Sequence, residues 1–303
     1  MKALPFMAAL TVVLGACMRA PEASPGDSVQ LESGVQGEAS PAGAAGVERV
    51  FLPVSPDSEI PADPLGASIR RGRALLEATR DSLPANVGNR LRCLSCHLDG
   101  GRRANSSPLV GSLLAYPAYS ARAGRVITIE DRINGCFRRS MAGRPLPVAS
   151  ADMRDMISYL AFLSRGVTAG SEVEGRGFPK MEPLDPDTAR GRVTYASTCA
   201  RCHGENGEGR PFAPPLWGTG SFSIGAGMAR LRTAASFIRY NMPYDLPGTL
   251  TDQQAFDVAA YVNSHSRPDL AGKENDWPNG DAPPDAAYPT RASTRRGTVA
   301  MER

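Results

Sequence analysis

Two five-residue segments with the pattern Cys-x-x-Cys-His constrain this chain more than any other feature. They occupy residues 93–97 and 199–203 of the 303-residue sequence and use four of its six cysteines and two of its three histidines. One helical turn of such a pentad presents two thiols to the vinyl groups of a haem, and the adjacent histidine lies under the iron. A zinc site or a redox-active disulfide is the alternative for a single pentad. Two pentads favour two covalently bound haems c, attached through Cys93, Cys96, Cys199 and Cys202 with His97 and His203 as proximal iron ligands.

The N-terminal segment, 1–17, is typical of an export signal. Lys2 precedes an apolar stretch that runs to Cys17 and is shorter than the about 20 residues of a membrane-spanning helix. The last four residues, Leu-Gly-Ala-Cys17, resemble a bacterial lipobox, in which the cysteine is lipidated and becomes the mature N-terminus. An ordinary cleaved signal with an incidental cysteine is the alternative. We expect an exported lipoprotein on the periplasmic or cell-surface side, anchored to the membrane through Cys17.

Small and polar residues dominate the segment after this signal. Ala, Pro, Ser and Gly make up most of the stretch from position 20 to position 47, and no aromatic residue occurs there. Such a segment buries too little apolar surface to offset the entropy lost on ordering, so residues 18–61 are predicted to be a flexible linker. The Ala-, Thr- and Arg-rich end, residues 286–303, is predicted to be a flexible tail.

The charge balance argues against one class of partner. The chain has 34 basic and 31 acidic residues, a net charge of +3. A nucleic-acid-binding protein of this size would carry a larger basic excess. We therefore expect no nucleic-acid partner.

The surroundings of the two pentads repeat. A helical pattern precedes each one, with an apolar stripe at Ile69, Leu75, Leu76 and Leu83 in the first case and a start near Asp187 in the second. A second amphipathic helix follows each pentad, and Thr251 and Gln254 fit a capping box for the later one. A unit of this kind resembles a class I cytochrome c domain, in which the haem supplies much of the core. The predicted fold is all-α, with two such domains in tandem at 62–168 and 184–285, each with one covalently attached haem.

Matched spacing identifies a candidate distal ligand for each haem. Met242 follows His203 at the same distance along the sequence as Cys136 follows His97. Cys136 is also the one cysteine not used for lipid or haem attachment. A thiolate ligand lowers the reduction potential and a thioether raises it, so haem 1 is predicted to be the low-potential centre and haem 2 the high-potential one. Met141 is the alternative ligand at haem 1, and core packing is the alternative role for Met242.

Arginines gather around Cys136. Six lie between positions 121 and 144, against Glu130 and Asp131, which gives this segment a net charge of +4. Guanidinium groups lower the pKa of a thiol and bind oxyanions through forked hydrogen bonds. For any single arginine a solvated basic surface is the alternative. The pattern predicts a small, doubly charged, sulfur-containing anion as the substrate.

The segment DRINGCFRRSMAGRPL, residues 131–146, resembles the dihaem thiosulfate dehydrogenase family, whose haem-ligating cysteine lies in an Asn-Gly-Cys-Phe-x-Arg-Ser-Met sequence. The Cys-Leu-Ser-Cys-His-Leu sequence and the Asp-Trp-Pro-Asn-Gly sequence at 276–280 are similar too, and the likeness extends over about residues 65–290. It implies that Cys136 is the catalytic haem ligand and that Arg122, Arg132 and Ser140 are active-site residues. Members couple two thiosulfates into tetrathionate, and some run the reverse reaction. The two electrons would leave through haem 2 to an external acceptor such as a small c-type cytochrome.

One position departs from part of this family. Some members carry a lysine immediately before the methionine of haem 2 and exchange the two ligands on reduction. Asn241 stands at that position here. Because an amide nitrogen is a poor iron ligand, we expect His203 and Met242 to coordinate haem 2 in both redox states.

Three other classes of protein fit part of the pattern. A dihaem peroxidase has two pentads but needs an open iron site, which Cys136 would close. A dihaem electron carrier would leave Cys136 and its arginines without a role. A Sox-type haem-thiolate sulfur oxidase shares the cysteine ligand but acts on the thiol of a partner protein.

Overall fold

The computed structural model describes residues 49–50 and 55–294 of the chain. All of them belong to one unit, Gly46–Arg303. The predicted lipidation site Cys17, most of the predicted linker and residues 295–303 lie outside the described residues.

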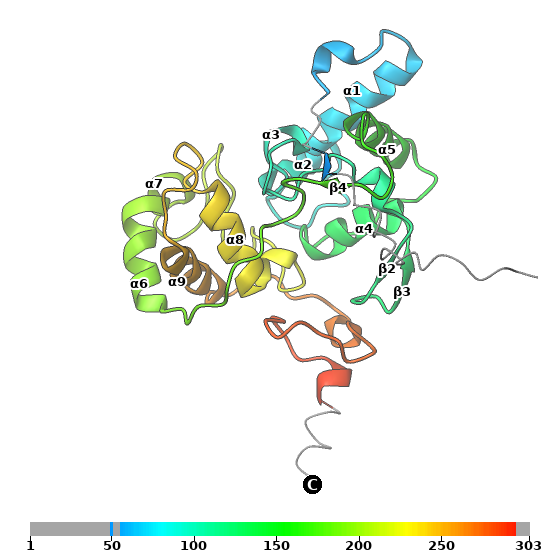
Figure 1. Cartoon of the computed structure of the whole chain (residues 1–303). Coiled ribbons are helices and arrows are strands. Elements are labelled where there is room, and N and C mark those ends of the chain that lie inside the picture. Colours follow the sequence, from blue (N-terminus) through cyan, green and yellow to red (C-terminus); the bar gives the residue numbers. More distant parts are fainter. Residues whose placement is uncertain (1–48, 51–54, 295–303) are drawn as a thin grey trace, which may run out of the picture. The chain divides into compact units, whose positions relative to one another are not determined.

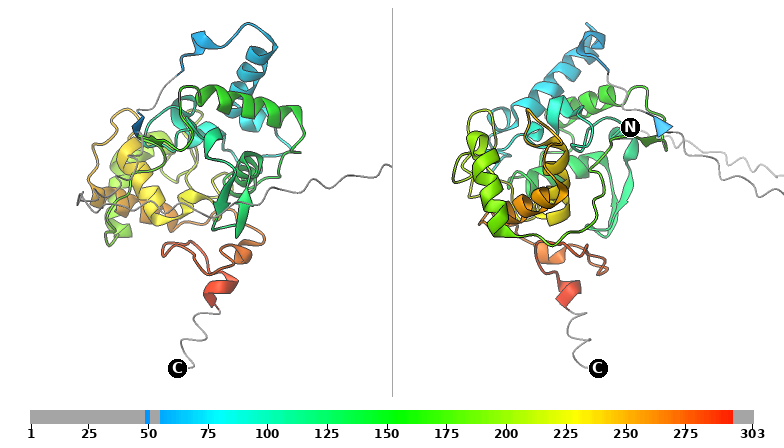
Figure 2. Two further views of the ribbon diagram at one scale, coloured as in Figure 1. Left: turned by 45° about the vertical axis from the view of Figure 1, so that its right-hand side comes forward. Right: turned by 60° about the vertical axis from the view of Figure 1, so that its left-hand side comes forward.

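The first predicted domain contains the first pentad and a pair of packed helices. Its helices are α1 (Pro64–Glu77), α2 (Thr79–Ser82), α3 (Leu98–Gly101), α4 (Ile129–Arg139) and α5 (Ala151–Leu163). A short antiparallel hairpin, β2 (Ala118–Ser120) and β3 (Arg125–Ile127), precedes α4. Helices α1 and α5 lie side by side (Figures 1 and 2). The apolar stripe predicted before the first pentad is confirmed, because Ile69, Leu75, Leu76 and Leu83 are all buried in this core.

The second predicted domain repeats this arrangement. Helix α6 (Thr188–Thr194) begins after the capping residue Asp187, as predicted, and continues through a π-helical turn into α7 (Ala200–His203). Helices α8 (Leu231–Asn241) and α9 (Asp252–Asn263) complete the domain, and α9 packs against both α6 and α8. The predicted capping box at the start of α9 is present. Outside the helices of the two domains, the short strands β1 (Arg49–Val50) and β4 (Glu172–Val173) pair in parallel.

Both helix pairs cross at a glycine. A Cβ atom at Gly72 of α1 would lie 1.9 Å from the carbonyl oxygen of Asp155 in α5, and one at Gly191 of α6 would lie 2.0 Å from that of Asp257 in α9. The backbones therefore approach more closely than any residue with a side chain permits.

Replacing Gly72 or Gly191 with alanine is expected to destabilise the folded state by about 1–3 kcal/mol, because the new methyl group forces the two helices apart. Thermal unfolding of the haem-loaded protein measures the effect. Gly227→Ala is the matched control, since a Cβ there meets only a Thr233 methyl group at 4.0 Å. An unchanged melting temperature in both test variants would contradict the close crossing.

Residues at both ends of the described chain contact the rest of the fold. In the predicted linker, Asp57 pairs with Arg73 and Arg102, and Ser55 is buried. In the predicted tail, Tyr288 and Thr290 are buried, and the Tyr288 hydroxyl donates to Asp276. Contacts with residues distant in sequence therefore extend into the predicted linker and the predicted tail.

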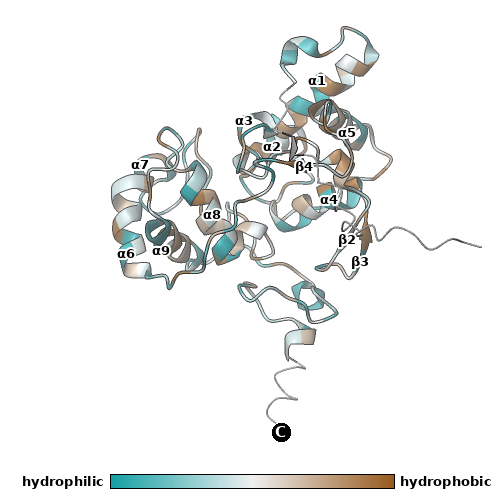
Figure 3. Cartoon of the chain, in the orientation of Figure 1, coloured by the Kyte–Doolittle hydropathy of each residue, from teal (hydrophilic) through white to brown (hydrophobic). Residues whose placement is uncertain are grey.

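The helices contain both hydrophilic and hydrophobic residues (Figure 3). In the part of the chain that the structure describes, none of the helices combines the length and the apolar character needed to cross a membrane.

Candidate functional site

The first pentad presents a histidine whose tautomer is set by the backbone. Cys93–Ser95 form a 3-10 turn, and the Nδ1–H of His97 donates to the carbonyl oxygen of Ser107 at 2.6 Å. A carbonyl only accepts, so the proton lies on Nδ1 and the Nε2 lone pair is left for a metal.

The second pentad is built in the same way. Cys199 ends the π-helical turn, α7 carries Cys202 and His203, and the Nδ1–H of His203 donates to the Pro214 carbonyl at 2.8 Å. Burial lowers the pKa of His203, which favours its neutral, metal-binding form. In the part of the chain that the structure describes, no disulfide bond involves the cysteines of either pentad. Each pentad thus offers two thiols and one oriented imidazole, which is the donor set that a covalently attached haem requires.

Cys136 lies on α4, opposite the first pentad's histidine. The capping box of Thr128 and Asp131 starts this helix, and Arg132, one turn before Cys136, donates from Nη1 to the Cys136 sulfur at 2.8 Å. Burial opposes ionisation of this thiol, but the charge and hydrogen bond of Arg132, together with the neighbouring His97, outweigh it and lower the pKa of Cys136 to about 6. The structure therefore brings Cys136, Arg132 and His97 together, and the sulfur has the environment of a thiolate.

Ser140 continues the line of residues spaced by four along α4. It caps the helix, and its N–H donates to the Cys136 carbonyl. Its own carbonyl accepts from Asn89 at 2.8 Å, and the same Asn89 amide donates to Ser221 at 2.9 Å. Arg132, Cys136 and Ser140 consequently lie on one face of α4.

Arg122, which follows β2, is held by other parts of the chain. Its Nη1 donates to the Gly225 carbonyl at 2.8 Å, its guanidinium lies 4.4 Å from the centre of the Trp277 ring, and its Nε lies 4.0 Å from Asp276. Among the described residues its contacts are with these segments rather than with Cys136. Sequence reasoning missed Asp276 and Gly225 as partners of this arginine, and the Asp-Trp-Pro-Asn-Gly motif was the available signal.

The arginine-rich segment does not act as a single cluster. Arg125 forms an exposed ion pair with Asp131 at 2.9 Å. This arginine therefore fits the alternative role of a solvated surface residue. Arg139 is instead bound to Asp276. Carboxylates thus neutralise two of the six arginines of this segment.

The residues around Met242 are anchored on the first domain. Met242 follows α8 in an extended conformation. The preceding residue, Asn241, is fully buried, and its amide nitrogen donates to the carbonyls of Asn105 at 2.9 Å and Phe237 at 3.2 Å. The Tyr244 hydroxyl donates to Asp99 at 2.7 Å. The amide nitrogen of Asn241 is therefore bound to two backbone carbonyls.

Met242→Gly is expected to remove the methionine-to-iron charge-transfer band near the red end of the oxidised spectrum and to lower the potential of haem 2, because the thioether ligand is lost. Haem content should not change. Met228→Leu, at a methionine packed against the core, is the matched control and should keep the band. A wild-type spectrum without it would refute Met242 as the ligand.

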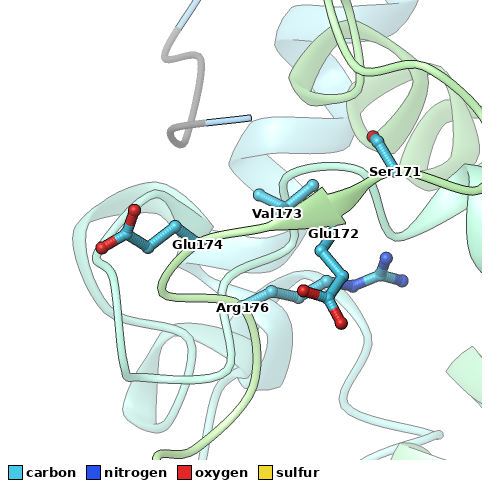
Figure 4. A pocket seen from close by; sticks show the side chains of 5 residues that line it. All are labelled: Ser171, Glu172, Val173, Glu174 and Arg176. Atoms are coloured by element: carbon cyan, nitrogen blue, oxygen red, sulfur yellow. The ribbon is translucent and has the colours of Figure 1, made fainter. Parts of the chain in front are cut away.

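One pocket is lined by other residues than these. It is formed by the segment that connects the domains, and its lining residues are Ser171, Glu172, Val173, Glu174 and Arg176 (Figure 4). No predicted site residue lines it, so it is not the candidate active site.

Comparison with known proteins identifies the family. Residues 85–169 match the family described as SoxA/TsdA, cytochrome c domain, and residues 186–262 match Cytochrome C oxidase, cbb3-type, subunit III. The chain is 45% identical over 249 residues to the thiosulfate dehydrogenase of Psychrobacter arcticus, an alignment that covers 80% of this chain and 76% of that protein. This chain belongs to the thiosulfate dehydrogenase family. The thiosulfate dehydrogenase of Allochromatium vinosum is 44% identical over 230 residues, which cover 72% of this chain and 85% of the relative.

A solved structure agrees with this membership of the thiosulfate dehydrogenase family. The thiosulfate dehydrogenase TsdBA from Marichromatium purpuratum, in its as-isolated form, superposes with a TM-score of 0.71 at 37% identity. The match covers 79% of this chain and 55% of the other, so the chain spans just over half the length of that protein. Both family matches are to cytochrome domains. The predicted tandem cytochrome c fold is therefore confirmed, and this thiosulfate dehydrogenase family member carries two covalently bound haems c.

Proposed function

We propose that this chain oxidises thiosulfate, joins two thiosulfate ions into one tetrathionate at Cys136, and passes the electrons out through haem 2. The observation that carries the proposal is the Cys136 thiol, bound by Arg132 at 2.8 Å and close to the pentad histidine His97. Relatives that are 45% and 44% identical are named thiosulfate dehydrogenases.

The reaction requires charge compensation more than proton transfer. Two thiosulfate dianions lose one electron each and form one sulfur–sulfur bond between their outer sulfurs, with no proton exchanged. The haems, when bound, supply the capacity to accept these electrons one at a time. Arg132 and Arg122 offset the charge of the paired dianions through bonds to sulfonate oxygens. Ser140, one turn after Cys136, offers a hydroxyl to a sulfonate oxygen or to the thiolate.

Cys136 provides a covalent route for this coupling. Loss of two electrons from its thiolate and one thiosulfate gives a cysteine S-thiosulfonate with a new sulfur–sulfur bond. The outer sulfur of a second thiosulfate then attacks the substrate sulfur that is bonded to the Cys136 sulfur. The bond to Cys136 breaks, tetrathionate leaves, and the Cys136 thiolate is restored. Charge and electrons balance in both steps.

Electrons are proposed to leave through the second domain. A His/Cys-coordinated centre has a lower potential than a His/Met-coordinated one, so transfer from haem 1 to haem 2 is downhill. The contacts of Asn241 with Asn105 and of Tyr244 with Asp99 join the loop of Met242 to the loop after the first pentad, which favours a short route. The final acceptor is an external carrier such as a small c-type cytochrome.

The place of action is proposed from the N-terminus. The lipobox-like sequence ending at Cys17 favours an exported lipoprotein held on a membrane by its acyl chains. Membrane fractionation of the wild type and of Cys17→Ala tests this, and a fully soluble processed wild type would refute it.

Anaerobic addition of thiosulfate to the oxidised dihaem protein is expected to reduce its haems and to form tetrathionate, with one tetrathionate for every two thiosulfates consumed in the presence of an acceptor. Sulfur-product chromatography and haem absorbance measure both. Peroxide without thiosulfate, and a sulfur-carrier protein added with thiosulfate, are the controls for a peroxidase and a Sox-type oxidase. Turnover only with peroxide or only with the carrier protein would overturn the proposal.

A further inference from the structure

The segment that follows α9, residues 266–294, is called here the C-terminal strap. It lies outside both regions that match cytochrome families, and it is drawn in orange to red in Figure 1. The N–H of Trp277 donates to the carbonyl of Arg122 at 2.9 Å, and the Asn279 amide donates to the Tyr119 hydroxyl at 2.9 Å. The strap is thus attached to the residues around β2 of the first domain.

Asp276 joins the strap to α4. It is 6% exposed, and its two carboxylate oxygens accept from Nη1 and Nη2 of Arg139 at 2.6 and 2.7 Å. Tyr288, also buried, donates to the same carboxylate. Arg139 lies on α4 three residues after Cys136, so the strap is fixed to the helix that carries the proposed reactive thiol.

Arg122 is oriented by the same segment. Its guanidinium faces the Trp277 ring at 4.4 Å, and its Nε lies 4.0 Å from Asp276. The Nη1 of Arg122 also donates a hydrogen bond to the carbonyl of Gly225, which holds another edge of the guanidinium. The buried carboxylate that binds Arg139 of α4 is therefore also within ion-pair distance of Arg122, and the indole ring lies against the face of the Arg122 guanidinium.

We propose that Asp276 and Trp277 are positioning residues that hold Arg122 in register with the Cys136 helix, so that its guanidinium binds one sulfonate group of the substrate or product. The inference rests on the proposed function. A guanidinium already fixed in its binding orientation loses little conformational entropy when the anion arrives, so the anion binds more tightly.

The direction in which Asp276→Asn changes the anion affinity distinguishes a positioning role of Asp276 from a purely electrostatic role. Asp276→Asn removes a negative charge beside two arginines. If the carboxylate acted only through its charge, the variant would bind a sulfonate anion more tightly. If it positions Arg122, the variant binds the anion more weakly, although the site has become more positive.

Tetrathionate binding to the fully oxidised dihaem protein is the test, because this state holds no electrons with which to cleave the ligand. Isothermal titration of wild type, Asp276→Asn, Trp277→Leu and Tyr288→Phe measures Kd without turnover. We expect Kd to rise about ten-fold for Asp276→Asn and Trp277→Leu, and less for Tyr288→Phe. In steady-state assays KM for thiosulfate should rise more than kcat falls. Glu274→Gln, which removes an exposed carboxylate of the same strap paired with Arg291 at 3.7 Å, is the matched control and should bind as wild type does.

A tighter or unchanged Kd in Asp276→Asn, with haem content and spectra intact, overturns the proposal. If that variant fails to fold, Trp277→Leu decides, since it alters no charge: wild-type affinity refutes the positioning role and weakened affinity supports it. A wild-type protein that binds no tetrathionate would instead refute the proposed function, so the two failures are distinguishable.

Discussion

Replacing Cys136 with methionine is expected to abolish nearly all thiosulfate-dependent reduction of an electron acceptor, while both haems stay attached and the fold is kept. A thioether carries no charge to pair with Arg132, which binds the native sulfur at 2.8 Å, and it cannot form and release a sulfur–sulfur bond with the substrate. We expect kcat/KM to fall by about three orders of magnitude or more, as for the loss of a nucleophile. Haem quantification reports on attachment, which depends on the four pentad cysteines, and circular dichroism reports on folding.

Met141→Leu is the matched control for this variant. Met141 lies five residues after Cys136, is 2% exposed in the first core, and is the alternative distal ligand. An exchange of similar volume should cost little stability and leave turnover intact. If Met141→Leu abolishes turnover and Cys136→Met retains it, the assignment of the catalytic ligand is reversed.

Arg132→Gln is expected to lower kcat/KM for thiosulfate by roughly 10- to 100-fold, because glutamine keeps a hydrogen-bond donor but loses the charge. A charge-assisted hydrogen bond contributes about 1.5–3 kcal/mol, which corresponds to this range. The guanidinium also supports the thiolate, since its charge helps to hold the pKa of Cys136 near 6. Steady-state kinetics and the oxidised haem spectrum measure the two effects.

Arg125→Gln controls for the general loss of positive charge. Arg125 belongs to the same basic segment but forms an exposed ion pair with Asp131, so the variant should stay within about two-fold of wild type, as is usual for exposed pairs. Equal losses in the two variants would show that charge in the segment, rather than the contact with Cys136, matters for turnover.

The sequence by itself determined the features whose chemistry is local. Two thiols and a histidine within five residues specify each pentad, and Thr251 with Gln254 specifies the start of α9 through contacts three residues apart. The burial of Leu75 and Leu76 follows from helical periodicity. The matched spacing that selected Cys136 also reflects a local repeat, and it selected a residue that the structure brings close to His97.

Only the tertiary structure decided which residues hold Arg122 and Met242. Arg122 lies beside Asp276, whose partner Arg139 is 137 residues away in sequence. Met242 follows Asn241, whose partner Asn105 is 136 residues away. Neither pair has a periodicity or a motif that links its members. The same is true of Tyr288, which stands in an Ala- and Thr-rich segment and is nevertheless buried beside Asp276. A composition rule gives the average tendency of a segment to order, whereas a buried ion pair forms only where the folded chain brings the two charges together. Such pairings depend on the path of the whole backbone, and for that reason the ends of the ordered chain and the surroundings of the arginines could not be predicted from local sequence.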